Sequence, residues 1–295
     1  PLVWQGALRL PRRGAAAELE IRSGLQNVLV DTPYPLGKKL KERRDSQVNL
    51  VFGGDVIPVR IRYGNQVSAA FALENRERRW IARRGEIRIG QGEARLPSDD
   101  GFHAFARVDK LDIDAWRKIM TTTETGGDTH SSEMNLREVD LEAAQVRVLS
   151  RRFKDVHVAA VNSPDGWHID MVSDKVTGTV TVPQRPNDAI VIDLARLYIE
   201  PAESVEHVER GVSTAPPPAE DPRTARAFQL SAADFRYADW VLGPLQLNAE
   251  RRTEGLHFTE LTLGEAPTNI SAQGSWLMTS AGASSRWQVD LRTDD

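Results

Sequence analysis

Hydrophobic and polar residues alternate with a period of two along much of this chain. Val59 and Ile61 lie on either side of Arg60, and Leu245 and Leu247 lie on either side of Gln246. The same alternation occurs at Val156 and Val158, at Ile190 to Leu194, at Leu256 and Phe258, and at Trp287, Val289 and Leu291. In a strand this spacing puts apolar side chains on one face and polar side chains on the other. The pattern therefore predicts many half-buried strands.

Turn-forming residues separate these runs, as at Gly64-Asn65, Ser163-Pro164-Asp165-Gly166 and Glu254-Gly255. Many short strands at near-regular spacing are typical of an all-β protein. Helical signals are confined to 112–120, which an aspartate could cap, and to 203–210.

Two breaks in the alternation predict β-bulges or turns. The apolar positions change phase between Leu194 and Leu197, and again between Phe258 and Leu261.

Composition divides the chain into sheet segments and loops. We expect sheet segments over 1–120, 136–200 and 226–295, with a flexible loop at 121–135 and a Pro-rich flexible loop at 201–225. The last segment is expected to continue beyond residue 295.

The chain repeats internally. A shift of 89 residues aligns 146–169 with 235–258 without a gap. Apolar residues meet apolar residues at alternate positions, and the turn glycine Gly166 falls on Gly255. Two matched strands with a matched turn between them favour an extended array of similar units.

Composition narrows the function classes. The 295 residues are 40% hydrophobic and 27% charged, with a net charge of -4 and no cysteine. Such a chain lacks the broad positive field of a nucleic-acid binder and any thiolate chemistry. No stretch approaches the roughly 18 consecutive apolar residues of a spanning helix. We expect membrane anchoring only through parts of a longer parent chain.

Candidate chemistry is sparse, and we expect neither an enzyme nor a cofactor or metal site. Nucleophile elbows, phosphate-binding loops and zinc motifs are missing from the sequence. The histidines are scattered, and those at 157, 168 and 257 are expected on a solvated face. Basic clusters at 38–44, 76–80 and 83–84 could contact anionic lipid headgroups or acidic glycans, or could simply be solvated.

Four stretches resemble the YhdP family of AsmA-like proteins. Asp31 to Lys38 is similar to the family's D-x-P-x-P-L-G-K turn, and Val108 to Trp116 to its V-x-x-L-D-L-x-x-W segment. The other two are Arg152-Phe153 with Gly166-Trp167, Gly178 and Ile190 to Leu197, and Phe235 to Trp276, which ends in Gly274-Ser275-Trp276. Their order and spacing cover essentially the whole chain, which looks like an internal segment of a longer protein.

The resemblance implies an elongated, curled antiparallel sheet, taco-like in section, built from repeating β-groove units with an apolar concave face and one or two short helices. It implies a section of a periplasmic bridge that carries phospholipid between the inner and outer membranes, in a parent protein anchored in the inner membrane. The implied partners are phospholipid acyl chains and other envelope proteins, with no nucleic acid.

The alternation supplies candidate residues for lining such a groove, because a one-sided apolar sheet must bury that side against something. Acyl chains could fill a curled sheet, at about 0.8 kcal/mol for each buried CH₂ group. The candidates are Val59, Ile61, Ile87, Ile89, Val146, Val148, Val156, Val158, Trp167, Ile169, Ile190, Ile192, Phe235, Tyr237, Leu245, Leu247, Leu256 and Phe258.

Two other interpretations stay open from the sequence. A secreted β-solenoid that binds or degrades glycans would also show repeats, but with a regular coil of about 20 to 25 residues. A passive envelope scaffold would use the same strands only for packing.

Overall fold

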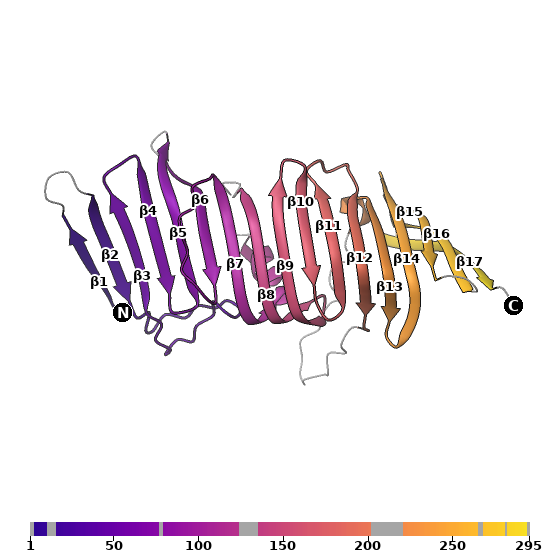
Figure 1. The fold of residues 1–295 in the computed structure, drawn as a ribbon, viewed down its shortest axis with the longest axis horizontal. Coiled ribbons are helices and arrows are strands. Elements are labelled where there is room, and N and C mark those ends of the chain that lie inside the picture. The colour runs from indigo at the N-terminus through magenta and orange to yellow at the C-terminus, as the bar shows by residue number, and fades with distance from the viewer. Residues whose placement is uncertain are drawn as a thin grey trace. The chain divides into compact units, whose positions relative to one another are not determined.

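The computed structural model describes residues 3–10, 16–76, 79–123, 135–201, 221–264, 268–280 and 282–293. Within these ranges the protein is all-β, as the alternation predicts, with 17 strands, one α-helix and one short 3-10 helix (Figure 1). The chain forms two compact units, Pro1–Ala159 and Ala160–Asp295. The helix expected at 203–210 and most of the two expected loops lie outside the described residues.

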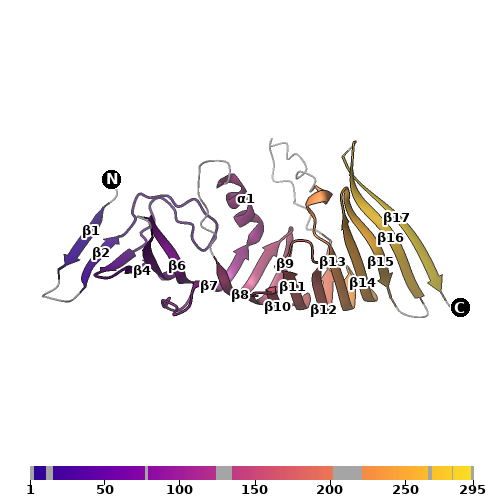
Figure 2. The ribbon, with the colours of Figure 1, turned by 90° about the horizontal axis from the view of Figure 1, so that it is seen from above.

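The first unit contains strands joined in chain order into a curled sheet. They are β1 (Trp4–Arg9), β2 (Ala17–Ser23), β3 (Ser46–Phe52), β4 (Val56–Tyr63), β5 (Val67–Arg76), β6 (Arg79–Ile89), β7 (Gly101–Asp112) and β8 (Leu136–Val148). β9 (Arg151–Ser163) begins in this unit and ends in the next. Figure 2 shows these strands curling toward the side that holds helix α1 (Ile113–Thr123).

The second unit is a sheet of the same kind. Its strands are β10 (Gly166–Val172), β11 (Val176–Pro183), β12 (Ile190–Ile199), β13 (Phe228–Tyr237), β14 (Trp240–Arg252), β15 (Gly255–Leu263), β16 (Thr268–Thr279) and β17 (Gly282–Thr293). A 3-10 helix, η1 (Pro222–Thr224), lies on the concave side of the strands from β13 onward (Figure 2).

Most of the pairings established for the described strands are antiparallel, but three of them are parallel, and there the expected antiparallel sheet is wrong. β6 pairs with β7, β7 with β8, and β12 with β13 in parallel. Parallel neighbours need a connection that returns the chain to the starting end. Three segments make these connections: residues 90–100 join β6 to β7, the segment that begins with α1 joins β7 to β8, and the segment that contains η1 joins β12 to β13. The mainly antiparallel register is not that of a β-solenoid of stacked parallel coils, which removes the fold on which the glycan interpretation depends.

The internal repeat is visible in the strands themselves. The turn between β8 and β9 (Leu149-Ser150) and the turn between β13 and β14 (Ala238-Asp239) are 89 residues apart, and Leu149 and Ala238 both have positive φ. Gly166 and Gly255 open β10 and β15 with φ of 129° and 148°. The sequence repeat therefore corresponds to two copies of one strand-turn-strand-turn-strand unit.

Helix α1 confirms the expected short helix. The Asp112 carboxylate accepts a hydrogen bond from the Ala115 backbone N–H at 2.8 Å, which satisfies a free donor of the first turn. Asp114 then ties the helix to the β8–β9 turn by accepting from the N–H groups of Leu149 (2.8 Å) and Ser150 (2.9 Å).

Replacing Asp114 with asparagine is expected to flatten the acid dependence of stability. Partial burial tends to raise the pKa of Asp114, but the two backbone bonds and the charges of Arg147 and Arg117 outweigh it, so its pKa lies below the usual 3.8. A depressed pKa stabilises the fold above the usual value, and this is lost as pH falls through the folded-state pKa. Thermal unfolding measured from pH 7 to about pH 3 should show a steeper acid loss in the wild type than in Asp114→Asn.

The exposed carboxylate Asp109 provides the control. Asp109→Asn should keep the wild-type acid dependence. Parallel curves for Asp114→Asn and the wild type would contradict the prediction.

Candidate functional site

One face of the second unit carries an uninterrupted apolar row across eight strands, which we call the inner row of that unit. Cross-strand register places its members directly beside one another. In order from β10 to β17 they are Ile169, Val180, Ile192, Leu230, Leu247, Leu261, Ala272 and Val289. The apolar face is therefore continuous along this unit.

The neighbouring row on the opposite face, the outer row, is polar on every strand. It consists of Asp170, Thr179, Asp193, Ser231, Gln246, Thr262, Ser271 and Asp290. Within the described residues of this unit, every strand belongs to the one sheet. No second sheet in that part of the chain covers the inner row.

The first unit repeats the arrangement. Its inner row runs from β1 to β8 through Gly6, Ile21, Val48, Ile61, Ala69, Ile87, Ala104 and Val139. Its outer row contains Gln5, Arg22, Gln47, Arg62, Ser68, Arg88, Phe105 and Asp140 in the same order. The one aromatic in that outer row, Phe105, lies under the Arg88 guanidinium at 4.4 Å.

Aromatic rings gather on the inner face of the second unit. Phe258 stacks on Trp287 with centroids 4.6 Å apart, and it meets Phe228 edge-on at 6.3 Å. These residues lie two strands apart, a backbone separation of about 9.5 Å, so their rings lean toward one another. Gly274 lies between Phe258 and Trp287 in register, and the Trp287 ring fills the space above it. Small residues thus make room for an aromatic surface.

The predicted breaks in alternation are confirmed as register shifts. The pairing of β11 with β12 shifts where Gly178 faces Leu194 and Thr177 faces Arg196, which leaves one extra residue on β12. The pairing of β15 with β16 shifts between Phe258 and Leu261. Because of the first shift, Leu194 and Leu197 both pack into one buried cluster with Ala232 and Leu245.

Most of the predicted lining residues lie on the two inner faces. Register places Val59, Ile61, Ile87 and Ile89 together in the first unit. It places Trp167, Ile169, Ile190, Ile192, Leu245, Leu247, Leu256 and Phe258 together in the second. Their role as a lipid lining stays a prediction.

The remaining predicted lining residues lie on or near the hairpins of the repeat. His157 contacts Asp140 of the outer row, so its neighbours Val156 and Val158 project from the opposite face. Val146 is buried and Phe235 packs against the Leu194 cluster. Val148 and Tyr237 close their strands beside the turns, where Tyr237 is exposed.

Several inner-face residues were not among the predicted lining. Leu230 and Phe228 begin β13 after the undescribed segment, and Ala272 lies beside Gly274 on β16. The alternation of Trp287, Val289 and Leu291 was present in the sequence, but only the register shows that it continues the same row. These three side chains are 42%, 60% and 66% exposed, so the apolar face is open to solvent there.

A folded connection covers part of the inner face in the first unit. It links β2 with β3 and contains the motif at 31–38. Tyr63, in register with inner-face residues, donates its hydroxyl to the Leu36 carbonyl at 2.9 Å, and the Trp116 indole of α1 donates to the Tyr34 carbonyl at 3.3 Å. The buried Lys38 ammonium donates to the carbonyls of Lys39 (3.0 Å) and Glu42 (2.7 Å). The motif therefore folds back on itself.

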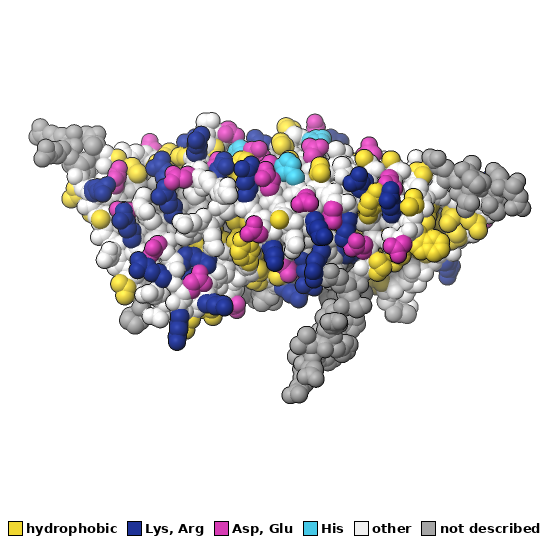
Figure 3. Space-filling model, turned by 60° about the horizontal axis from the view of Figure 1, so that its bottom comes forward, with side chains coloured by type: hydrophobic (Ala, Val, Ile, Leu, Met, Phe, Trp, Pro, Cys, Tyr) yellow, Lys and Arg dark blue, Asp and Glu magenta, His cyan; other side chains and the backbone are white. Residues whose placement is uncertain are grey.

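The outer faces carry charged side chains of both signs (Figure 3). On β12 and β13, the side-chain hydrogen bond from Arg236 and then that from Tyr198 lower the pKa of Asp234 below its usual value. The bond to Asp234 in turn raises the pKa of Tyr198. These hydrogen bonds satisfy the polar groups of Asp234, Arg236 and Tyr198 on the outer face.

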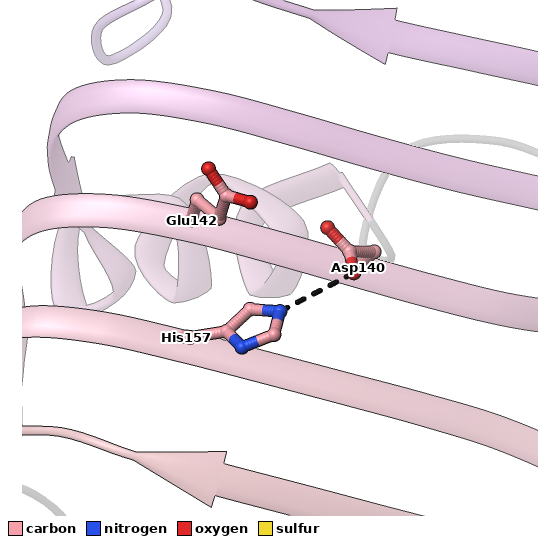
Figure 4. A group of neighbouring side chains, drawn as sticks. All are labelled: Asp140, Glu142 and His157. Atoms are coloured by element: carbon pink, nitrogen blue, oxygen red, sulfur yellow. Dashed lines mark hydrogen bonds and ion pairs between the residues drawn. The ribbon is translucent and has the colours of Figure 1, made fainter.

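One outer-face cluster has the residue types of a metal site. Asp140 and Glu142 of β8 lie beside His157 of β9, with ligand atoms within 4.8 Å of one another (Figure 4). The side chains are 33%, 47% and 50% exposed, and His157 Nε2 lies 3.4 Å from Asp140 Oδ2. Arg107 already pairs with Glu142 at 3.0 Å. The geometry is that of a solvated ionic cluster, as the position of His157 on a polar face predicts.

Together these features define an all-β protein of curled sheets with one apolar and one charged face. The chain belongs to the YhdP family. The model of this family, described as "YhdP protein", matches residues 2–295. This is a family of AsmA-like envelope proteins of lipid transport. Searches of the curated proteins and of the solved structures gave no significant match. Among the described residues, no helix has the length and apolar character needed to cross a membrane.

Proposed function

We propose that the inner faces hold the acyl chains of phospholipid, and that the segment is part of a periplasmic bridge between the inner and outer membranes. The observation that carries the proposal is the pair of inner rows. Each is apolar on every strand that it crosses, while the adjacent outer row is mostly or wholly polar. Family membership supports the same ligand class.

The free energy of acyl-chain burial favours transfer of a lipid between membranes over its tight retention by the protein. Each CH₂ group removed from water contributes about 0.8 kcal/mol, so two acyl chains on an apolar face gain on the order of 20 kcal/mol relative to water. A bilayer offers nearly the same gain. The difference between the two is therefore small, which lets a lipid enter from one membrane and leave to another. The headgroup stays in water above the open side of the sheet.

Photo-crosslinking tests the face assignment with residues one position apart. A photoreactive amino acid at Ile61 or Leu247, each in an inner row, is expected to capture phospholipid from vesicles. The same probe at Arg62 or Gln246, in the outer rows, is expected to capture at least tenfold less, because neighbouring strand residues face opposite sides. Mass spectrometry of the adducts measures both.

The two units provide independent readings, since one probe pair lies in each. Equal lipid capture by the inner-row and outer-row probes of a pair would contradict the face assignment. Capture of no lipid at Ile61 and Leu247 would favour a passive scaffold.

A further inference from the structure

The connection into β13 places a small cover on the inner face of the second unit. Residues 221–227, which we call the strap, include η1. Pro222 is less than 2% exposed, and η1 packs on β15 and β16. The strap then returns to β12, where the Ala227 carbonyl accepts from the Ile190 N–H at 2.9 Å. It therefore spans the ends of β14 and β13.

The strap is long enough to reach from β15 to β12. Three strand spacings separate β15 from β12, or about 14 Å. Seven residues reach at most about 23 Å when fully extended. The concave position of η1 in Figure 2 puts the strap on the inner face. Arg251, the register partner of Leu256 in the inner face, donates to the Arg223 carbonyl at 3.1 Å.

The two ends of the strap are held very differently. At the β12 end, Arg226 donates to the carbonyls of Pro183 (3.2 Å), Arg185 (2.8 Å) and Asp188 (3.0 Å). At the β15 end, η1 packs on β15 and β16 with the Pro222 ring beside Gly255, and Arg251 donates a single hydrogen bond. Lifting the Pro222 ring uncovers three methylene groups and breaks one hydrogen bond, and an acyl chain seated on the same face covers the apolar surface that the ring leaves. Releasing the Arg226 end would break three hydrogen bonds, so the β15 end is the one that an acyl chain displaces.

We propose that the strap is a displaceable cover that is regulated by the ligand itself. It is seated on β15 and β16 when this part of the inner face is empty, and an acyl chain lifts Pro222 from its site while Arg226 acts as the hinge. This inference rests on the proposed function, since it assigns a regulatory element to the same apolar face. It makes the strap the point at which lipid entry into the β14–β16 part of the face is limited.

Distance measurement tests the movement, and the cysteine-free chain makes the labelling clean. Spin labels at Thr224→Cys on the strap and Thr259→Cys on β15 should show a single short distance in the full chain. Vesicles of phosphatidylethanolamine and phosphatidylglycerol are expected to add a longer-distance population. Glycerophosphoethanolamine, which has the headgroup but no acyl chains, should not. A control pair at Thr259→Cys and Ser284→Cys should stay unchanged. An unchanged strap distance with vesicles would overturn the inference.

A chemical crosslink that holds the strap on the sheet distinguishes an error in the strap proposal from an error in the proposed function. A bismaleimide bridge between Thr224→Cys and Arg252→Cys should reduce lipid capture by a photoreactive residue at Phe258 at least fivefold. Capture at Ile169 on β10, away from η1, should be unchanged. Capture at both sites regardless of the lock would overturn the strap and keep the function. Capture at neither site, locked or unlocked, would contradict the function itself.

A weaker latch should have the opposite effect of a lock. Pro222→Ser removes the buried ring and is expected to raise capture at Phe258 about threefold to tenfold. Pro186→Ser alters an exposed proline of the same unit and should leave capture unchanged. A fall in capture with Pro222→Ser, with the fold intact by circular dichroism, would contradict a cover.

Discussion

Replacing Gly255 with alanine is expected to destabilise the protein by about 3 kcal/mol or more. Gly255 opens β15 at φ 148°, and a Cβ there would meet the Trp276 carbonyl oxygen at 2.2 Å and the Leu277 Cα at 3.1 Å. Both neighbours are backbone atoms of the paired strand, so no side-chain rotation relieves the clash. Urea unfolding followed by tryptophan fluorescence measures the change. Gly166→Ala should behave alike, because its Cβ would lie 2.2 Å from the Val182 carbonyl oxygen.

Two other glycines distinguish the stability cost of a Cβ clash from the cost of a positive φ. Gly282 has φ 110° but no atom within 4 Å of a Cβ, so Gly282→Ala should cost only about 1 kcal/mol. Gly54 has neither feature, and Gly54→Ala should be close to neutral. A Gly255→Ala variant as stable as Gly282→Ala would show that β16 can move away, against the prediction.

Replacing Val289 with glutamate is expected to reduce acyl-chain capture on β16 and β17 by about 10- to 100-fold with little loss of stability. Val289 ends the inner row but is 60% exposed, so a charge there stays hydrated in the empty protein. An acyl chain on this face would have to desolvate the carboxylate, at a cost of about 2.5 kcal/mol or more. Photo-crosslinking from Leu291 measures capture, and thermal unfolding measures stability.

Gln288→Glu is the matched control, because it adds the same charge one residue away on the opposite face. It should leave capture and stability unchanged. Equal losses from both substitutions would indicate a general charge effect and would contradict the proposed path.

Much of the fold could be predicted because local physics decided it. Alternation at Val59 and Ile61, or at Leu245 and Leu247, identifies both the strand and its apolar side. The aspartate before α1 marks the helix start, and the phase changes at Leu194 and Phe258 mark bulges. Each signal depends only on neighbours within a few residues, so the sequence displays it directly.

The candidate site could be predicted only in part. Alternation shows that Val289 and Ile169 each belong to an apolar face, but it cannot show that seven register steps connect them in one row. The parallel pairing of β12 with β13 follows from a long connection with little local pattern. Pro222 likewise has no signal of burial in its own sequence, because its partners β15 and β16 follow later in the chain.

The sequence by itself determined that this is an all-β chain of repeated, one-sided strands with a family-typical order of motifs. Strand type and side follow from the period of two, which is a local property. Only the tertiary structure decided which strands are parallel, which glycines admit no side chain, and that the strap lies across the apolar face. Those features arise from hydrogen bonds and contacts between residues far apart in the chain, whose partners no local pattern specifies.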